Sequence, residues 1–461
     1  MQSIKKLAPV IAPLAFCLLL LSGCRNTERL NWSPDGSKGA VDASDGLRIT
    51  DADGNLSAPV LDRVELSGWL PDSHSLCVVT TSDVKKWSDL LKLLPADETK
   101  SAGAAAELIW KSKNPSQTLR KEGSKRGLLV LAYLREKYGG TLLAQRMHAK
   151  IKDIPQAVPV HSLKVVDING TVKESPSIYT TAYGADHLRV SPNGNTAVLC
   201  VSKDVGYVIQ LVRLKGTGPN GGKRIETLKE EVFGVPEWSR DGKSLFYFTC
   251  PLLSEKGKGE YCSDKQPVIA WLKKVDVTGQ NGYLLPNVSK IEPTLLAHVI
   301  SAGSSHIQSL ADGSIVFSGR KQTYPLLVSD ATEAYIFKMN SALTKIEELV
   351  PSSKIPEGVF DKFQANSDGT RFAFYDDRGK VVSYDVAAGS GKVLAQKAED
   401  SELKVEPNWR NSDELSYSLI RNGASQRLYD IVLADMRKPG ATTTLSKDWP
   451  AKAIEFLLPG K

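Results

Sequence analysis

The chain has 461 residues, of which 41% are hydrophobic, and a formal net charge of +7. This is the composition of an ordinary globular protein with enough apolar side chains for a sizeable core, so it excludes a chain too polar to fold. With 59 basic and 52 acidic side chains, the positive excess is small.

Residues 1–23, "MQSIKKLAPVIAPLAFCLLLLSG", pair two lysines with an apolar run. The run is too short and too often interrupted by proline to span a bilayer, so it predicts a secretion signal. Its end, "LSGC", resembles the lipobox of bacterial lipoproteins. The resemblance implies that Cys24 carries lipid and attaches the mature chain to a membrane. Arg25 stands where Asp usually retains Gram-negative lipoproteins in the inner membrane, which favours the outer membrane, facing the periplasm; the extracellular face of the cell membrane is the alternative location. The alternative is an ordinary signal with a stray cysteine.

Four further cysteines remain in an exported chain, where disulfides are permitted. Cys250 and Cys262 flank "PLLSEKGKGEY", and a disulfide between them would join the ends of this loop. Cys77 and Cys200 lie inside apolar runs, where a buried free thiol is at least as good an interpretation as a disulfide.

A short turn motif recurs along the chain. It first occurs as Pro34-Asp35-Gly36 in "LNWSPDGSKGAV", where proline presets one dihedral, aspartate accepts backbone N–H groups and glycine tolerates positive φ. An aromatic or aliphatic residue precedes each copy and an apolar strand follows, so each copy predicts a β-hairpin. The other copies are "GWLPDSHSLCVV" (68–79), "RVSPNGNTAVLCV" (189–201), "EWSRDGKSLFYF" (237–248), "QSLADGSIVFSG" (308–319), "QANSDGTRFAFY" (364–375) and "NWRNSDELSYSL" (408–419).

A second hairpin follows in most units, where an apolar strand ends at an aspartate before a glycine-containing turn: residues 46–57, 162–173, 270–280 and 381–393. Two hairpins make a four-stranded antiparallel sheet. Such a sheet has two apolar faces and open edges, which radial stacking of blades covers. Most repeats, counted from Trp32, Trp69, Val190, Trp238, Leu310, Ala365 and Trp409, are spaced by about 40 to 50 residues, the period of propeller blades.

The "WSPDG" and "WSRDGKSLFYF" units resemble the TolB-type, WD40-like β-propeller repeat of bacterial periplasmic proteins. The fifth unit departs from the pattern because it lacks Trp and Pro, and the seventh because it lacks Gly. The prediction is an all-β propeller with seven four-stranded blades by count; six is the alternative, because TolB has six. The carboxyl-terminal "AIEFLL" (453–458) predicts a short strand that completes a sheet with the amino-terminal residues.

A helical insertion interrupts the second blade. "SDVKKWSDLLKLL" (82–94) predicts a helix with Ser82 or Asp83 as its cap, and further helices are expected in the segments 103–113, 124–140 and 141–153. The expected organisation is therefore a signal over 1–23, propeller blades over 24–81 and 156–461, and a helical insertion over 82–155.

The insertion over 82–155 is basic, with fifteen lysines and arginines against eight acids. An anionic lipid, an anionic envelope polymer or an acidic protein would suit such a module. The candidate binding residues are Lys85, Lys86, Lys121, Lys125 and Arg126. The simpler interpretation is a solvated helix surface.

Catalytic patterns do not stand out. The sequence has no G-x-S-x-G, H-E-x-x-H or C-x-x-C motif and no phosphate-binding glycine loop. His298 and His306 could approach a central channel and bind a metal there, but ordinary polar positions in loops or in the channel explain these histidines better. "DADGNLSAPVLD" (51–62) places oxygen ligands as a calcium loop does, yet Leu56 stands where glycine is required, and a hairpin turn explains the same residues. We therefore expect no catalytic residues, no metal site, no cofactor and no nucleic-acid partner.

The leading hypothesis is a lipoprotein whose propeller acts as a protein-binding scaffold in the cell envelope, with an unidentified protein partner. The competing hypothesis is a propeller enzyme, a polysaccharide lyase or hydrolase acting through the central channel.

Overall fold

The computed structural model describes residues 30–94, 96–121, 124–173, 178–179, 185–203, 206–215, 225–250, 268–301, 306–320, 334–355, 362–375, 380–395, 407–422, 427–438 and 440–454. Within these residues the chain is mostly β, and its strands form six sheets. The predicted signal and Cys24 lie outside the described residues.

Three sheets form the first part of the chain. The first holds β1 (Leu30–Trp32), β2 (Lys38–Ala43) and β3 (Gly46–Asp51). The second holds β4 (Val64–Trp69), β5 (Ser75–Val84), β6 (Val158–Asp167) and β7 (Ile178–Tyr179). The third holds β8 (His187–Val190), β9 (Thr196–Lys203), β10 (Gly206–Arg213) and β11 (Ile225–Thr227).

The fourth sheet has eight strands and consists of two antiparallel meanders that share a single residue pair, Ile300 with Arg320. One meander is β12 (Phe233–Trp238), β13 (Ser244–Thr249), β14 (Val268–Asp276) and β15 (Thr294–Ser301). The other is β16 (Ile307–Ser309), β17 (Ile315–Arg320), β18 (Ala334–Met339) and β19 (Ile346–Pro351).

Two four-stranded sheets follow. The fifth holds β20 (Lys362–Ala365), β21 (Arg371–Tyr375), β22 (Val381–Asp385) and β23 (Ser390–Ala395). The sixth holds β24 (Asn408–Trp409), β25 (Glu414–Asn422), β26 (Arg427–Asp435) and β27 (Thr442–Thr444). Single 3-10 turns occur at η5 (Val288–Lys290) and η6 (Ser352–Lys354).

All seven predicted hairpins are confirmed, since each turn motif joins the first two strands of a sheet or meander. In every turn a side-chain oxygen of Asp or Asn accepts the backbone N–H two residues further on, at 2.9–3.1 Å. These residues are Asp35, Asp72, Asn193, Asp241, Asp312, Asp368 and Asn411. The bond lies within the turn itself, which explains why the local sequence was sufficient to predict it.

The second predicted hairpin forms a strand pair only in residues 381–393, as β22 and β23. After β3, β6 and β14 the returning chain makes only isolated bridges, such as Val166 with Val172. The fourth strand of those sheets comes later in the chain, as β7 and β15, and the first sheet has three strands in the described residues.

Hydrogen bonds from tryptophan connect the first strands of neighbouring sheets. The indole Nε1 of Trp69 donates to the carbonyl of Asn31 (2.7 Å), that of Trp238 to Arg189 (3.2 Å) and that of Trp409 to Gln364 (3.1 Å). In the second meander of the fourth sheet the equivalent position is Ser309, whose hydroxyl donates to the carbonyl of Trp238. The repeat count placed this position one residue too late, at Leu310.

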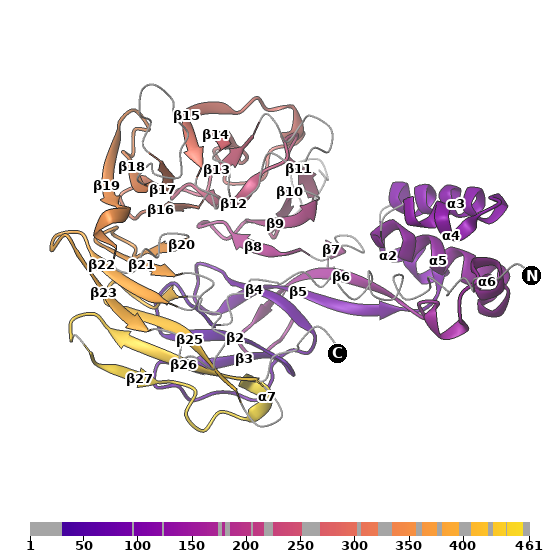
Figure 1. The fold of residues 1–461 in the computed structure, drawn as a ribbon, viewed down its shortest axis with the longest axis horizontal. Coiled ribbons are helices and arrows are strands. Elements are labelled where there is room, and N and C mark those ends of the chain that lie inside the picture. The colour runs from indigo at the N-terminus through magenta and orange to yellow at the C-terminus, as the bar shows by residue number, and fades with distance from the viewer. Residues whose placement is uncertain are drawn as a thin grey trace, which may run out of the picture.

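The sheets pack in a cycle. An apolar cluster lies between each pair of neighbouring sheets or meanders, for example Leu66, Cys77, Leu188 and Leu199 between the second and third. The cycle closes between the first and last sheets of the described chain, because Leu30, Trp32 and Val41 of the first sheet pack against residues of the sixth, namely Ile431, Leu433 and Leu445. Figure 1 shows the indigo first sheet beside the yellow sixth.

The carboxyl terminus corrects one prediction. Residues 451–454 form the helix α7 (Ala451–Ile454), so the strand expected from 453 onward is wrong at its first two residues; residues 455–461 lie outside the described residues. Trp449 still connects the two ends of the chain, because its Nε1 donates to the carbonyl of Gly54 (2.6 Å) and its ring is buried against the first sheet.

Candidate functional site

The helices between β5 and β6 form the most distinctive part of the surface. They are α2 (Trp87–Leu93), α3 (Ala96–Lys111), α4 (Pro115–Lys121), α5 (Ser124–Tyr138) and α6 (Gly140–Met147), followed by the turn η1 (Ile151–Asp153). We call residues 85–157 the helical arm.

A two-stranded ribbon carries the helical arm. Strands β5 and β6 pair as far as Val84 with Val158, whereas the outer strands β4 and β7 pair with them only as far as Thr80 and Ser162. Beyond those residues the ribbon has no lateral strand in the described part of the sheet. Figure 1 shows the helices gathered at the far end of this ribbon, away from the other sheets. The arm is therefore attached to the sheets through the ribbon.

The arm has its own core. Leu119, Val130, Leu134 and Leu143 are among the side chains buried between α3, α4, α5 and α6. A second cluster joins the arm to the ribbon, because Trp87, Leu90 and Leu129 pack on Val158 and Val160. The first cluster makes the arm a folded unit, and the second attaches this unit to the tip of the ribbon.

The predicted start of the first helix was wrong. Ser82, Asp83 and Val84 continue β5, and α2 begins only at Trp87. The backbone N–H groups of Trp87 and Ser88 donate to the carboxylate of Glu136 on α5, rather than to a local Ser or Asp. A cap contributed by a residue so far along the chain has no signature in the sequence next to the helix.

Arginines of the arm hold its segments together. Arg135 on α5 donates to the carbonyl of Lys85, where the chain enters the arm, and to that of Pro155, where it leaves. Arg126 donates to the carbonyl of Ser101 (3.1 Å), and Arg146 to that of Ser112 (2.9 Å). Hydrogen bonds from a cationic guanidinium to carbonyls are among the stronger ones in proteins. These three side chains therefore act in the folding of the arm.

A charged network joins α3 to α5. The hydroxyl of Tyr133 donates to Glu107 (2.7 Å), and Lys137 forms an ion pair with the same carboxylate. The hydrogen bond from Lys137 lowers the pKa of Glu107, and the bond to Glu107 raises that of Tyr133. Trp110 stacks on Tyr138 beside this network, with ring centroids 4.0 Å apart. These contacts stabilise the helix pair.

The predicted binding residues fall into three groups. Lys85, Lys86 and Lys121 are exposed. Arg126 is half-buried and bonded as described above, and the side chain of Lys125 lies outside the described residues. Composition could not separate these groups, because the distinction depends on which carbonyls lie within reach of each cation.

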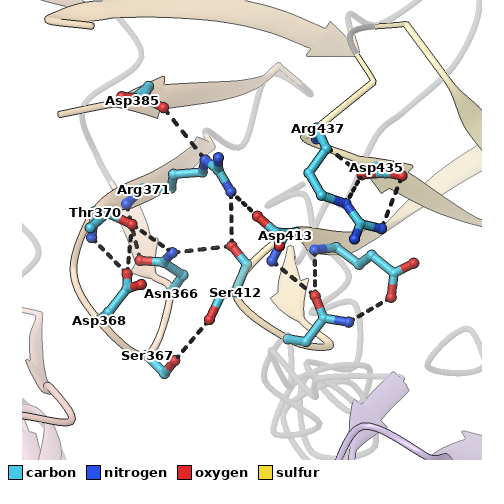
Figure 2. A network of polar contacts seen from close by, with 12 residues as sticks. Asn366, Ser367, Asp368, Thr370, Arg371, Asp385, Ser412, Asp413, Asp435 and Arg437 are labelled. Atoms are coloured by element: carbon cyan, nitrogen blue, oxygen red, sulfur yellow. Dashed lines mark hydrogen bonds and ion pairs between the residues drawn. The ribbon is translucent and has the colours of Figure 1, made fainter. Parts of the chain in front are cut away.

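A second polar cluster lies between the fifth and sixth sheets (Figure 2). The guanidinium of Arg371 on β21 pairs with Asp413 and, at 3.5 Å, with Asp385, and it donates to the carbonyl of Ser412 (3.2 Å). The hydrogen bond to Asp413 raises the pKa of Arg371. Asn366 donates to the same carbonyl (3.1 Å). These contacts hold the two sheets together, and so we assign the cluster a structural role.

The other singled-out residues lie in structural positions. Asp51 accepts the N–H groups of Asp53 (3.0 Å) and Asn55 (2.9 Å), as a hairpin turn requires. His298 lies edge-on to Trp271, and His306 edge-on to Phe363, so each packs against an aromatic ring. No group of three metal-ligating side chains lies together in the described ranges.

The cysteines are placed in part. Cys77 and Cys200 are buried free thiols, as the interpretation of apolar runs allowed, and burial raises the pKa of Cys200 to about 12. Cys250 is buried at the end of β13, whereas Cys262 lies outside the described residues, so the disulfide between them stays a prediction. In the portion of the chain that the structure describes, no helix is both long and apolar enough to cross a bilayer.

Comparison with known proteins gives distant structural similarity. No family model matches the chain, and no curated protein matches it in sequence. TolB from Acinetobacter baumannii is 15% identical over 60% of this chain and 58% of its own, with a TM-score of 0.37. The β-propeller domain of Swd1 from Myceliophteria thermophila is 9% identical over 85% of this chain and 93% of its own, with a TM-score of 0.43. An oligogalacturonate lyase in complex with manganese is 12% identical over 57% of this chain and 82% of its own, with a TM-score of 0.29. At these TM-scores the comparisons assign no activity and no blade count.

Proposed function

We propose that this chain is a lipid-anchored β-propeller of seven blades that acts as a binding scaffold in the bacterial cell envelope. The observation that carries the proposal is the cycle of apolar clusters, which joins each sheet or meander to the next and the last to the first. Closure of this kind covers the faces of all blades and gives a rigid frame from which loops and the helical arm project. The repeated polar residues are used within turns, so the scaffold's binding surface is to be sought elsewhere.

The anchor is the predicted lipid on Cys24, and the "LSGC" sequence supports it. Only six positions separate Cys24 from the first strand at Leu30. Because a chain extends by at most about 3.6 Å per residue, Leu30 at the start of the first sheet lies within roughly 20 Å of the bilayer once Cys24 carries lipid. We place the chain on the periplasmic side of the outer membrane, because Arg25 stands where an inner-membrane lipoprotein usually has Asp.

The test is a Cys24→Ser variant expressed with its signal in a Gram-negative host. A fatty-acid analogue should label the wild type and miss the variant, and the variant should appear in the soluble periplasmic fraction after a salt wash. A Cys77→Ser variant is the matched control and should be labelled as the wild type is. Equal labelling of wild type and Cys24→Ser would reject the anchor.

The scaffold role is tested against an enzymatic one on purified protein. Stoichiometric tightly bound metal, or turnover of acidic oligosaccharides, would reject a purely binding role. The binding role would be supported by a protein that cross-links to the propeller in cells. This cross-link should be lost when surface residues of the propeller are changed in a variant that is still lipidated.

A further inference from the structure

Exposed apolar side chains are concentrated on the helical arm. Among the described residues, eight large apolar side chains are exposed, and four of them are on the arm: Leu91, Leu108, Leu142 and Ile151. The two most exposed are Leu108 (71%) and Ile151 (55%). The arm makes up about a fifth of the described residues, yet half of the exposed large apolar side chains among them lie on it. Single exposed leucines are ordinary, but their concentration on one module is not.

The arm also carries exposed cations without acidic partners. Within the described part of the arm, no carboxylate lies within 4.0 Å of nine exposed basic side chains: Lys85, Lys86, Lys100, Lys111, Lys113, Arg120, Lys121, Lys150 and Lys152. Residues 85–157 as a whole hold fifteen basic residues against seven acids. The arginines Arg126, Arg135 and Arg146 are bonded to carbonyls, so the cations available for binding are mainly lysines.

The apolar and cationic side chains are neighbours. Ile151 lies between Lys150 and Lys152 in the chain, and all three are exposed. On α3, Leu108 precedes Lys111 by three residues, which places both on one face of the helix. A leucine or isoleucine tip beside long, mobile cations is the arrangement that binds the interface of an anionic bilayer, where apolar tips enter the headgroup boundary and ammonium groups pair with phosphate.

We propose that the helical arm docks on an anionic lipid bilayer and gives the chain a second membrane contact besides its lipid. The four apolar side chains belong to four elements, α2, α3, α6 and η1, so they can enter a headgroup layer as separate tips. The charge complements a membrane of anionic headgroups. The lipid on Cys24, which rests on the proposed function, would already hold the chain at a membrane.

The experiment uses the full mature chain with Cys24→Ser, so that no lipid contributes. Its binding is measured by co-sedimentation with vesicles of phosphatidylcholine alone and with vesicles that also contain phosphatidylglycerol. We expect at least tenfold tighter binding to the anionic vesicles, and loss of most of that difference at 1 M salt, where screening acts within about 3 Å.

Two variants test the residues. The basic variant replaces four arm lysines (K111E, K113E, K150E, K152E). Each substitution is expected to lower partitioning onto anionic vesicles by about fivefold. The four together should therefore abolish the preference for anionic vesicles. The apolar variant (L108S, I151S) should weaken binding at least threefold while keeping the salt dependence. Circular dichroism must show that both variants keep the helices of the wild type.

Matched controls change the same residue types outside the arm. They are four exposed lysines (K290E, K354E, K392E, K438E) and two exposed apolar residues (L295S, I346S). These controls should bind as the parent does. The proposal is overturned if the parent does not bind vesicles, or if it binds neutral and anionic vesicles equally. It is also overturned if the control variants weaken binding as much as the arm variants do. Polyglutamate serves as an acidic polymer for comparison, and binding of the parent to polyglutamate or to an acidic protein but not to vesicles would likewise reject the proposal. Because no variant here is lipidated, these outcomes are independent of the labelling test for Cys24.

Discussion

Removal of the helical arm is the sharpest test of how this molecule is built. Because β5 and β6 pair up to Val84 with Val158, residues 85–157 can be replaced by Asn-Gly, a two-residue turn suited to joining neighbouring antiparallel strands. Replacing residues 82–155, the span predicted from the sequence, would not keep this register, because it removes Ser82, the residue that pairs with Val160. The remaining strands would then close as an ordinary hairpin.

The expected cost follows from what the arm covers. Val158 and Val160 are buried under Trp87, Leu90 and Leu129, and deletion exposes them. Full burial of one valine contributes about 1.5–3 kcal/mol, so the local loss is about 3–6 kcal/mol. That loss falls on the end of the ribbon, which can fray without disturbing the sheets. We therefore expect the main unfolding transition to shift by less than about 5 °C.

The assay is thermal unfolding followed by circular dichroism and by tryptophan fluorescence, with gel filtration for aggregation. The helical signal at 222 nm should fall and the cooperative β transition should remain. A second version with Val84→Thr, Val158→Thr and Val160→Thr separates insolubility of the exposed valines from loss of folding. If neither version has a cooperative transition, the arm is part of the folding unit of the sheets and the reasoning is refuted.

Three other changes have defined outcomes. Trp449→Ala removes a buried ring and its bond to the carbonyl of Gly54, and should lower the free energy of unfolding by about 3–5 kcal/mol; a loss under about 1 kcal/mol in denaturant titration would show that this contact does not join the chain ends. The bonds from Ser33 and Ser37 lower the pKa of Asp35 from 3.8 to about 2, so its contribution to stability is present above about pH 4 and is lost as the pH falls toward 2. Asp35→Asn keeps a side chain that serves the same turn at Asn411, and the gap between its denaturation midpoint and that of the wild type should shrink as the pH falls; a constant gap would contradict the assignment. Arg213 is 5% exposed, and its Nη2 donates to the carbonyl of Leu284 (3.3 Å), whereas within the described residues its Nε and Nη1 have no hydrogen-bond partner. Arg213→Met should therefore leave the free energy of unfolding unchanged or raise it by about 1 kcal/mol; a loss above about 2 kcal/mol would mean that Nε or Nη1 is paired.

The hairpins could be predicted because their decisive contacts are local. In "SPDG" the Asp35 carboxylate accepts the N–H of Ser37 (3.1 Å) and the hydroxyl of Ser33 (2.6 Å), all within five residues. The apolar strand that follows identifies itself by composition. The sequence also indicated that an insertion divides the second sheet, because helical periodicity replaces the strand pattern between Thr81 and Gln156.

Tertiary structure decided the features that depend on distant partners. Glu136 caps α2 from 49 residues away, and Arg135 reaches carbonyls at both ends of the arm. Likewise, Trp449 bonds to Gly54 across 395 residues, so the first sheet is tied to the last described residues by a tryptophan, beside a short helix that includes the first two residues of the expected strand. Turn geometry is set by bonds between near neighbours in the chain, whereas caps, clamps and the exposure of each lysine depend on which groups folding brings within about 3 Å, and no local pattern records that.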